Sequence, residues 1–367
     1  MKVMQVSNFY AEFKGSFINQ LEELEKKVNE DGGSMVYVFP LDAKKIEWCN
    51  KLQKNNKVYF VSNTQQANQK QIIKELKAII DKEQPDIIHS HFDGYDVPIT
   101  KASSKDTIKV YHRHNEFDVS KLCWYKKIYA LTLIDVKMRY LKKEGYNIFI
   151  THDMQKVFVE KGIAIKEKSI TILNGIFTRR LEGNIKTIRH YEKPVIFSFM
   201  GNWYSKGGDL IFKAIEEINK KEVKVYLASI ISEFHIKQYY GNIPKWFILL
   251  EVTEDIKAYY NTADLFVSSS RKETFSYALA EAIYCKLPCI SSDIDGTQWA
   301  KEFETIEFFE SENIDELINK INYVLNNKYS KEKLEHSKEI LKNKFSEQVW
   351  STNIMKFYEN IKGKGEK

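Results

Sequence analysis

Two glutamates that follow an apolar run are well placed for chemistry. Residues 264–267, Asp-Leu-Phe-Val, predict the end of a buried strand, and Ser268, Ser269 and Ser270 then open a loop. Glu273 lies on this loop, and Glu281 follows within a helix rich in alanine. A carboxylate in so apolar a helix is costly unless hydrogen-bond partners reach it. The sequence therefore predicts a ligand site with two carboxylates at the carboxyl end of a strand.

A lysine between glycines predicts a phosphate site earlier in the same half of the chain. The expected strand 195–201 ends at Gly201, and Asn202, Lys206 and Gly207 precede a helix with apolar residues at helical spacing. Backbone N–H groups, a helix dipole and an ammonium group together favour a phosphate. A plain turn between strand and helix is the alternative. We also expect Ser276 to cap the helix that carries Glu281.

Two expected strands of the first half each end in a pair of histidines. His89 and His91 end the segment 85–91, and His112 and His114 lie near the end of 108–115. Four histidines at two strand ends could bind a metal ion. However, no cysteine is nearby, and we expect only one histidine of each pair to face a given side of the sheet. We therefore expect no metal.

Strand-like and helix-like segments alternate along the whole chain, which predicts α/β domains with parallel sheets. A polar stretch at 179–193 predicts the boundary between two domains. The expected strands are 2–8, 34–40, 57–62, 85–91, 108–115, 147–151 and 169–175 in the first half, and 195–201, 224–230, 246–251, 264–269, 287–293 and 305–310 in the second.

Net charge, cysteine spacing and the length of apolar stretches exclude several classes of protein. The 367 residues carry a formal net charge of +6, which is too small by itself to indicate nucleic acid. The four cysteines have no zinc-like spacing, and no stretch approaches the ~20 apolar residues that span a bilayer. We expect a cytoplasmic protein. The segment 120–145 combines apolar residues at helical spacing with many lysines, which favours a helix on an anionic membrane surface or, equally, a packed helix with a solvated face.

The segment from Glu273 to 293 resembles the E-x7-E region of retaining GT-B glycosyltransferases of the family 4 type (glycosyl transferases group 1). Seven residues separate Glu273 from Glu281, Phe275 lies between them, and the expected strand 287–293 follows. The segment 85–91, PDIIHSH, is similar to a strand of bacterial capsule and exopolysaccharide glycosyltransferases. The segment 172–176, ILNGI, resembles the family's exit from the first domain, although Phe177 stands where the family has Asp.

This resemblance implies roles for individual residues. Glu273 would contact the donor sugar, Glu281 the ribose hydroxyls, and Lys206 the diphosphate. Asn202 replaces the family's arginine, which Arg271 or Lys272 could compensate. On the acceptor side, His114 would lie nearest the reacting sugar and donate a hydrogen bond as a neutral imidazole, with His112 and His91 beside it. Further residues expected on the donor side are Gly15, Gly201, Gly207, Thr274, Phe275, Ser276, Gly296 and Thr297.

The resemblance also implies the architecture and the reaction. Two Rossmann-like domains would face each other across a cleft, an acceptor domain of residues 1–185 with 346–367 crossing back to it, and a donor domain of residues 186–345. A sugar would pass with retention from a nucleotide-diphosphate sugar, UDP-linked by preference, to a saccharide acceptor. That acceptor would be polyprenyl-linked, as in surface polysaccharide synthesis, and the protein would bind the inner membrane face peripherally. Two alternatives stay open: a nucleotide-sugar epimerase or phosphorylase on the same fold, and a non-catalytic partner of a true transferase.

Overall fold

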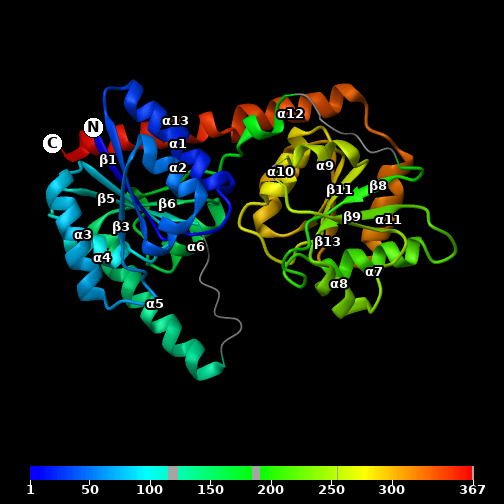
Figure 1. The fold of residues 1–367 in the computed structure, drawn as a ribbon, viewed down its shortest axis with the longest axis horizontal. Helices are drawn as coiled ribbons and strands as arrows, with labels where there is room; N and C mark the ends of the chain where they lie inside the picture. Colours follow the sequence, from blue (N-terminus) through cyan, green and yellow to red (C-terminus); the bar gives the residue numbers. More distant parts are fainter. Residues whose placement is uncertain (115–122, 184–190, 254, 366–367) are drawn as a thin grey trace. The chain divides into compact units, whose positions relative to one another are not determined.

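The chain forms two compact α/β units, seen here in a computed structural model that describes residues 1–114, 123–183, 191–253 and 255–365. Met1–Gly175 and Glu347–Lys367 form the first unit, and Ile176–Ser346 form the second (Figure 1). The predicted boundary between 185 and 186 falls within 184–190 and so lies outside the described residues.

The sheet of the first unit is parallel and has the order β3-β2-β1-β4-β5-β6-β7. Because the order reverses direction beside β1, the carboxyl ends of β1 and β4 lie at a switch point of the sheet, where such sheets bind ligands. The strands are β1 (Lys2–Ser7), β2 (Ser34–Pro40), β3 (Lys57–Val61), β4 (Ile87–His91), β5 (Ile108–Arg113), β6 (Tyr146–Phe149) and β7 (Ser169–Thr171).

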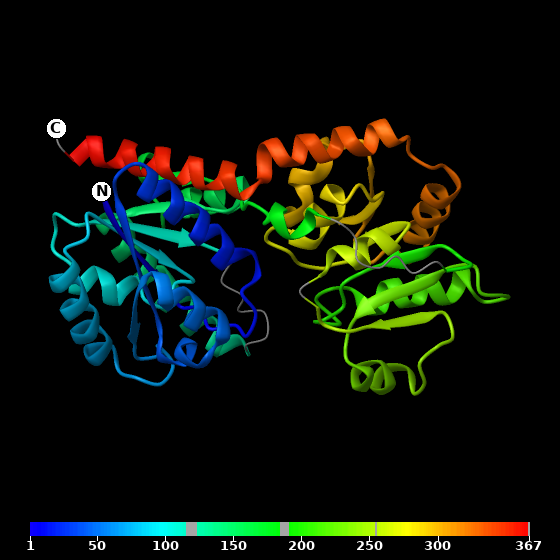
Figure 2. The ribbon, with the colours of Figure 1, turned by 45° about the horizontal axis from the view of Figure 1, so that its top comes forward.

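Helices cover both faces of this sheet. On one face, Leu21 and Leu24 of α1 pack in one core with Ile354 and Tyr358 of α13, and the two helices lie side by side (Figure 2). On the other face, α3, α4 and α6 form a second core. The helices are α1 (Gly15–Glu30), α2 (Glu47–Asn55), α3 (Gln69–Glu83), α4 (Asp96–Ala102), α5 (Trp124–Glu144), α6 (His152–Glu160) and α13 (Glu347–Gly365), with short turns η1 (Leu41–Lys45) and η2 (Lys166–Lys168).

Local sequence explains these elements well, as α3 illustrates. Ile72, Leu76 and Ile79 recur at helical spacing and are buried. Asn68 caps the start of the helix by accepting a hydrogen bond from a backbone N–H of the first turn. Gln84 ends it in the left-handed conformation.

The second unit contains a parallel sheet of order β10-β9-β8-β11-β12-β13. Its strands are β8 (Val195–Phe197), β9 (Tyr226–Ile230), β10 (Phe247–Leu250), β11 (Leu265–Ser268), β12 (Cys289–Asp293) and β13 (Ile306–Glu310). Its helices are α7 (Gly208–Ile218), α8 (Glu233–Tyr240), α9 (Lys257–Thr262), α10 (Tyr277–Tyr284), α11 (Ile314–Asn326) and α12 (Lys331–Phe345), with η3 (Thr178–Leu181) and η4 (Asp295–Glu302).

The order of this second sheet also reverses, between β8 and β11. The loops after these two strands carry Lys206 and Glu273, so the topology brings together residues that are 67 positions apart. Apolar residues of β8, β11 and α7 form the core beneath these loops, including Ile196, Ile211 and Val267. The predicted α/β class with two parallel sheets is thus confirmed, and each expected strand is present with ends shifted by a few residues.

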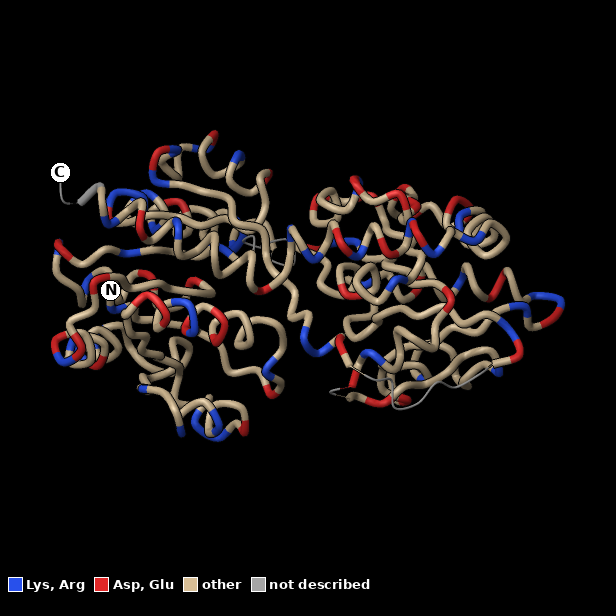
Figure 3. The backbone as a smooth tube through the Cα atoms, turned by 90° about the horizontal axis from the view of Figure 1, so that it is seen from above, with Lys and Arg blue, Asp and Glu red and all other residues tan. Residues whose placement is uncertain are grey.

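Basic and acidic residues are interspersed along both units (Figure 3). The helix α5 differs in another way, because most of its apolar residues are exposed. Of the positions expected to form one apolar face, only Met138 and Leu141 are buried, whereas Trp124 is 76% exposed. The first half of α5 therefore has no packed face among the described residues.

Candidate functional site

The Lys206–Glu273 ion pair lies at the centre of the predicted donor site, in the second unit. The Lys206 ammonium lies 2.5 Å from one carboxylate oxygen of Glu273, and the Ser270 hydroxyl donates to the same oxygen at 2.9 Å. Both charged side chains keep some exposure, 34% for Lys206 and 14% for Glu273. A ligand from solvent can therefore reach both.

Two glycines allow the surrounding loops to approach closely. A Cβ at Gly207 would stand 1.9 Å from the backbone oxygen of Ser269, and Gly207 also has a left-handed φ of +63°. A Cβ at Gly296 would stand 2.2 Å from the backbone oxygen of Glu273. Because real Cβ atoms do not come so close to an oxygen, both positions require glycine. Gly207 and Gly296 therefore fix the loop that carries Glu273 between α7 and η4.

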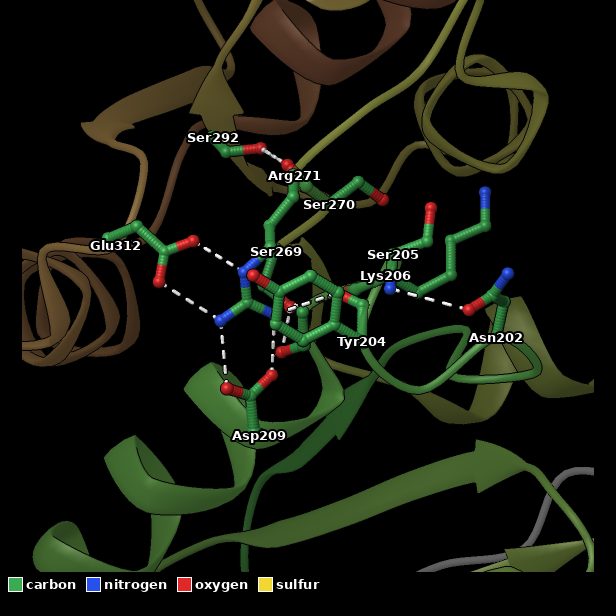
Figure 4. Close-up of polar contacts among 11 residues, drawn as sticks. Asn202, Tyr204, Ser205, Lys206, Asp209, Ser269, Ser270, Arg271, Ser292 and Glu312 are labelled. Carbon is green, nitrogen blue, oxygen red and sulfur yellow. Dashed lines mark hydrogen bonds and ion pairs between the residues drawn. The ribbon is translucent and has the colours of Figure 1, made fainter. Parts of the chain in front are cut away.

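Arg271 is held by acidic residues of two helix starts (Figure 4). Its guanidinium donates two hydrogen bonds to Asp209, at 2.6 and 2.8 Å, and also pairs with Glu312. It lies 4.1 Å from the ring centre of Tyr204 as well. Hydrogen bonds to Asp209 and Glu312 raise the pKa of Arg271. A direct role of Arg271 at a diphosphate would require these bonds to break.

Asn202, which stands at the position of the family's arginine, serves the turn after β8. It is exposed, its side-chain oxygen accepts from the backbone N–H of Ser205 at 3.4 Å, and its carbonyl accepts from that of Lys206 at 2.8 Å. Gly201 before it is exposed, with open space where a Cβ would stand. In this structure Asn202 therefore shapes the loop that presents Lys206.

Glu281 is buried and already has two partners. Arg180 of η3 forms an ion pair with one carboxylate oxygen, and the Tyr260 hydroxyl donates to the other at 3.1 Å. Burial, and then the charge of Glu281, raise the pKa of Tyr260 well above its usual value, so that it stays a donor. The partners that a buried carboxylate requires thus come from η3 and α9. A ribose hydroxyl that bound Glu281 would have to share or replace Arg180.

The other predicted donor residues hold the loops together. Ser276 stands at the start of α10, but its side chain makes no capping hydrogen bond, so the expected cap is wrong. Phe275 is buried and stacks on Trp299, with ring centres 4.8 Å apart. The hydroxyl of Thr297 is buried and donates to the carbonyl of Ser292 at 2.8 Å. Thr274 is half-buried on the loop before α10.

The predicted glycine of the first unit begins a helix. Gly15 is the first residue of α1 and has a left-handed φ of +57°, with open space where a Cβ would stand. Its carbonyl accepts a hydrogen bond from the side-chain amide of Asn19 at 2.7 Å. Glycine is therefore needed here for its backbone conformation.

Four of the histidines in the first unit, those at the ends of β4 and β5, form one buried cluster, and this contradicts the expected alternation. His89 and His91 are two residues apart, so the strand period of two places them on the same face of the sheet. Their ring centres lie 4.2 Å apart, as do those of His112 and His114. The argument against a shared site was therefore wrong.

These imidazoles are neutral. Burial lowers the pKa of His89 and of His114 to about 3, and it lowers the pKa values of His91 and His112 well below the usual range. His114 is 7% exposed, and one of its ring nitrogens, Nε2, lies 2.9 Å from Nδ1 of His91. The structure thus brings the three predicted acceptor-side histidines together.

Sequence reasoning missed Arg180, Tyr260 and Ser270 at the donor site, and Gln5 and Tyr358 at the histidine cluster. Arg180 precedes its partner Glu281 by 101 positions, and Tyr358 follows His89 by 269. No local pattern connects such pairs. For Glu281, burial in an apolar helix indicated only that some partner had to exist.

Comparisons with known proteins agree with this picture. The chain has the fold of a glycosyltransferase from Rickettsia africae (TM-score 0.78, 16% identity, 98% of each chain covered) and of Anabaena Alr3699/HepE in complex with UDP (0.78, 15%, 98% of this chain and 100% of that one). Sucrose-phosphate synthase from Thermosynechococcus elongatus is also similar (0.78, 13%, 99% of each chain). A comparison with the sequences of curated proteins finds no match.

Residues 182–344 match the family described as "Glycosyl transferases group 1". This range contains the Lys206–Glu273 pair, both helix starts joined by Arg271, and Glu281. This part of the chain is therefore similar to glycosyl transferases group 1, and the match supports the predicted enzyme class, a glycosyltransferase.

Proposed function

We propose that the protein is a retaining glycosyltransferase of the family 4 type that moves a sugar from UDP-sugar to a saccharide acceptor. The observation that carries this proposal is the Lys206–Glu273 pair at the switch point of the second sheet. It places a cation for a diphosphate beside a carboxylate for sugar hydroxyls. Both groups are partnered by each other until the donor arrives, so neither charge is left unpaired.

Binding of the donor would separate Lys206 from Glu273, because each residue would contact a different part of the donor. Phosphate oxygens would take the Lys206 ammonium, and sugar hydroxyls would donate to Glu273. Negative charge grows on the diphosphate as the bond to the anomeric carbon breaks, and Lys206 together with the start of α7 would stabilise it. On the acceptor side His114 is neutral, so it can exchange a hydrogen bond with an acceptor hydroxyl without carrying charge.

A pocket of about 360 Å³ in the second unit offers room for a nucleotide base. Leu250, Glu251 and Thr253 line it at the end of β10, together with Tyr259 of α9. UDP is our first choice, because the Anabaena structure with the same fold contains UDP.

The acceptor would be a lipid-linked saccharide in surface polysaccharide synthesis. The exposed part of α5 supports this proposal, since Trp124 and Tyr129 lie close to the exposed Lys126 and Lys127. Aromatic and basic side chains together suit the interface of an anionic membrane. Within the described part of the chain, no helix is long and apolar enough to cross a bilayer.

The donor site would work without a metal ion. Lys206 and the backbone N–H groups at the start of α7 would supply the positive field that a divalent cation supplies in other transferases. UDP binding to the purified protein, measured by calorimetry, should therefore be unchanged by EDTA. A Kd that weakens tenfold in EDTA and recovers with Mg²⁺ would contradict this part of the proposal.

A thermal-shift screen of UDP, GDP, ADP, CMP and TDP tests the proposal directly. A ligand that binds only the folded state stabilises it by about 2.7 kcal/mol at a hundredfold excess over Kd, so UDP should raise the melting temperature more than the others. Lys206→Met should abolish most of this shift. Lys213→Met, which replaces an exposed lysine of α7, the helix that follows Lys206, is the matched control and should keep it.

The non-catalytic alternative draws on Asn202, which supplies no positive charge, and on the bonds that hold Arg271. It predicts no stabilisation by any of the five nucleotides. Under the proposal, by contrast, UDP-sugar should be converted to UDP only when acceptor is present. Absence of any nucleotide shift in the wild-type protein would therefore overturn the proposed function.

A further inference from the structure

The histidine cluster of the first unit contains more unsatisfied polar atoms than a core normally tolerates. His89, His91 and His112 come from the ends of β4 and β5 and are at most 1% exposed. Among the described residues, both ring nitrogens of His112 and Nε2 of His89 have no hydrogen-bond partner. Each buried and unsatisfied polar group costs about 1–3 kcal/mol. Three such atoms in one cluster require an explanation, such as a bound ion.

The partners of the remaining nitrogens show which atoms are turned inward. Nδ1 of His89 lies 2.6 Å from the hydroxyl of Tyr358, on α13. Nε2 of His91 donates to the side-chain carbonyl of Gln5, on β1, at 2.8 Å. Histidines that bind metals are held in this way, with one nitrogen on the metal and the other on an outer hydrogen-bond partner. This leaves Nε2 of His89 and Nδ1 of His91 as the inner atoms.

We propose that His89, His91 and His112 bind a divalent transition-metal ion of the zinc class in the first unit. One ring nitrogen from each of the three residues lies within 4.8 Å of the others. Three bonds of about 2.0–2.1 Å to one ion would require these atoms to close to roughly 3.4 Å. Neutral imidazole is the form that binds such ions, and zinc with three histidines keeps a fourth position for an oxygen ligand.

The charged residues around the cluster would not repel a bound cation. Arg113, next to His112 on β5, is paired with the carboxylates of Asp93 and Asp96, so its charge is neutralised locally. Nδ1 of His91 is at present 2.9 Å from Nε2 of His114. A metal ion would take the lone pair used in that contact and release His114. The ion would thus join β4 to β5 and, through Tyr358, to α13.

This site is separate from the proposed donor site, because its three ligands and both outer partners belong to the first unit, whereas His91 and His112 adjoin His114 on the proposed acceptor side. The expectation of no metal was based partly on the alternation that the structure contradicts. The donor site, in the second unit, remains free of metal under both proposals.

Metal analysis of the purified full-length chain tests the site. After dialysis against metal-free buffer, the wild-type protein should take up one equivalent of Zn²⁺ or Co²⁺ per chain, and Co²⁺ should give the visible absorption of a four-coordinate ion. His112→Ala and His89→Ala should weaken binding at least about tenfold. His152→Ala removes an exposed histidine of the same unit and should bind as the wild type does.

A further variant keeps the test valid if the alanine substitutions impair folding. Tyr358→Phe retains the ring and all three ligands but loses the outer partner of His89, so it should stay folded and bind Co²⁺ about 10–100-fold more weakly. If His112→Ala takes up as much metal as the wild type does, the proposal is overturned. A folded wild-type protein that takes up no Zn²⁺ or Co²⁺ would also overturn it.

Discussion

The strand ends of the two units differ in charge: ion pairs lie at those of the second unit, and neutral histidines lie at those of the first. In the second unit, Lys206 with Glu273, and Arg180 with Glu281, are pairs of full charges that neutralise each other. In the first unit, the residues at the equivalent edge are neutral histidines, almost completely buried, and three of their nitrogens have no partner in the described part of the chain. A charged, phosphate-bearing ligand can exchange with an ion pair, whereas neutral imidazoles suit hydroxyl groups or a metal ion. Under the proposed function, this difference fits a donor on the second unit and an acceptor on the first.

The largest effect should come from Glu273→Gln. The amide keeps the size of the side chain but loses the charge that would accept hydrogen bonds from the sugar, so transfer should fall by roughly 10²–10³-fold. The thermal shift with UDP should persist, because the residue would contact the sugar rather than the nucleotide. Initial rates with UDP-sugar and acceptor measure the first effect. A variant with full transfer activity would remove Glu273 from the site.

Vesicle binding should depend on the first unit alone. Replacement of Lys126 and Lys127 by Gln should weaken binding to anionic vesicles by about 2 kcal/mol, roughly 30-fold, since each cation near the surface contributes about 1 kcal/mol. Lys142 is left unchanged, because it donates to the carbonyl of Gly162. Transfer to a soluble acceptor analogue should not change. If flotation assays show equal binding for variant and wild type, the exposed part of α5 serves another purpose.

Deoxynucleotides test the role of Glu281. The wild type should bind UDP about 10–20-fold more tightly than 2′,3′-dideoxy-UDP, because a hydrogen bond to a charged group contributes about 1.5 kcal/mol at the low end of its range. Glu281→Ala should bind the two nucleotides equally. Tyr260→Phe is the milder control, since it removes one partner of Glu281 and leaves the carboxylate in place. Discrimination that survives in Glu281→Ala would show that another group binds the ribose.

The fold was largely predictable from sequence because its signals are local. Alternating apolar strands and helices give two parallel sheets, and α3 shows both apolar residues at helical spacing and a capping side chain. Glu273 and Lys206 could be proposed from their positions after strands, since the ends of parallel strands meet at one edge. Arg180 and Tyr358 could not, because their contacts depend on how distant segments pack. The alternation argument failed because it applied the period of adjacent residues to residues two apart.

The smallest effect should come from Arg271, and it distinguishes a structural role from a role in binding. Its bonds to Asp209 and Glu312 join the starts of α7 and α11, but both acidic partners are partly exposed, at 28% and 57%. Such pairs contribute modestly, so Arg271→Met should lower the free energy of unfolding by about 1 kcal/mol. Denaturant unfolding measures this change, with Arg139→Met as a control for an exposed pair within one helix. The UDP-induced thermal shift should remain as in the wild type. A lost shift with unchanged stability would instead show that Arg271 leaves Asp209 to bind the diphosphate, in place of the arginine that Asn202 replaces.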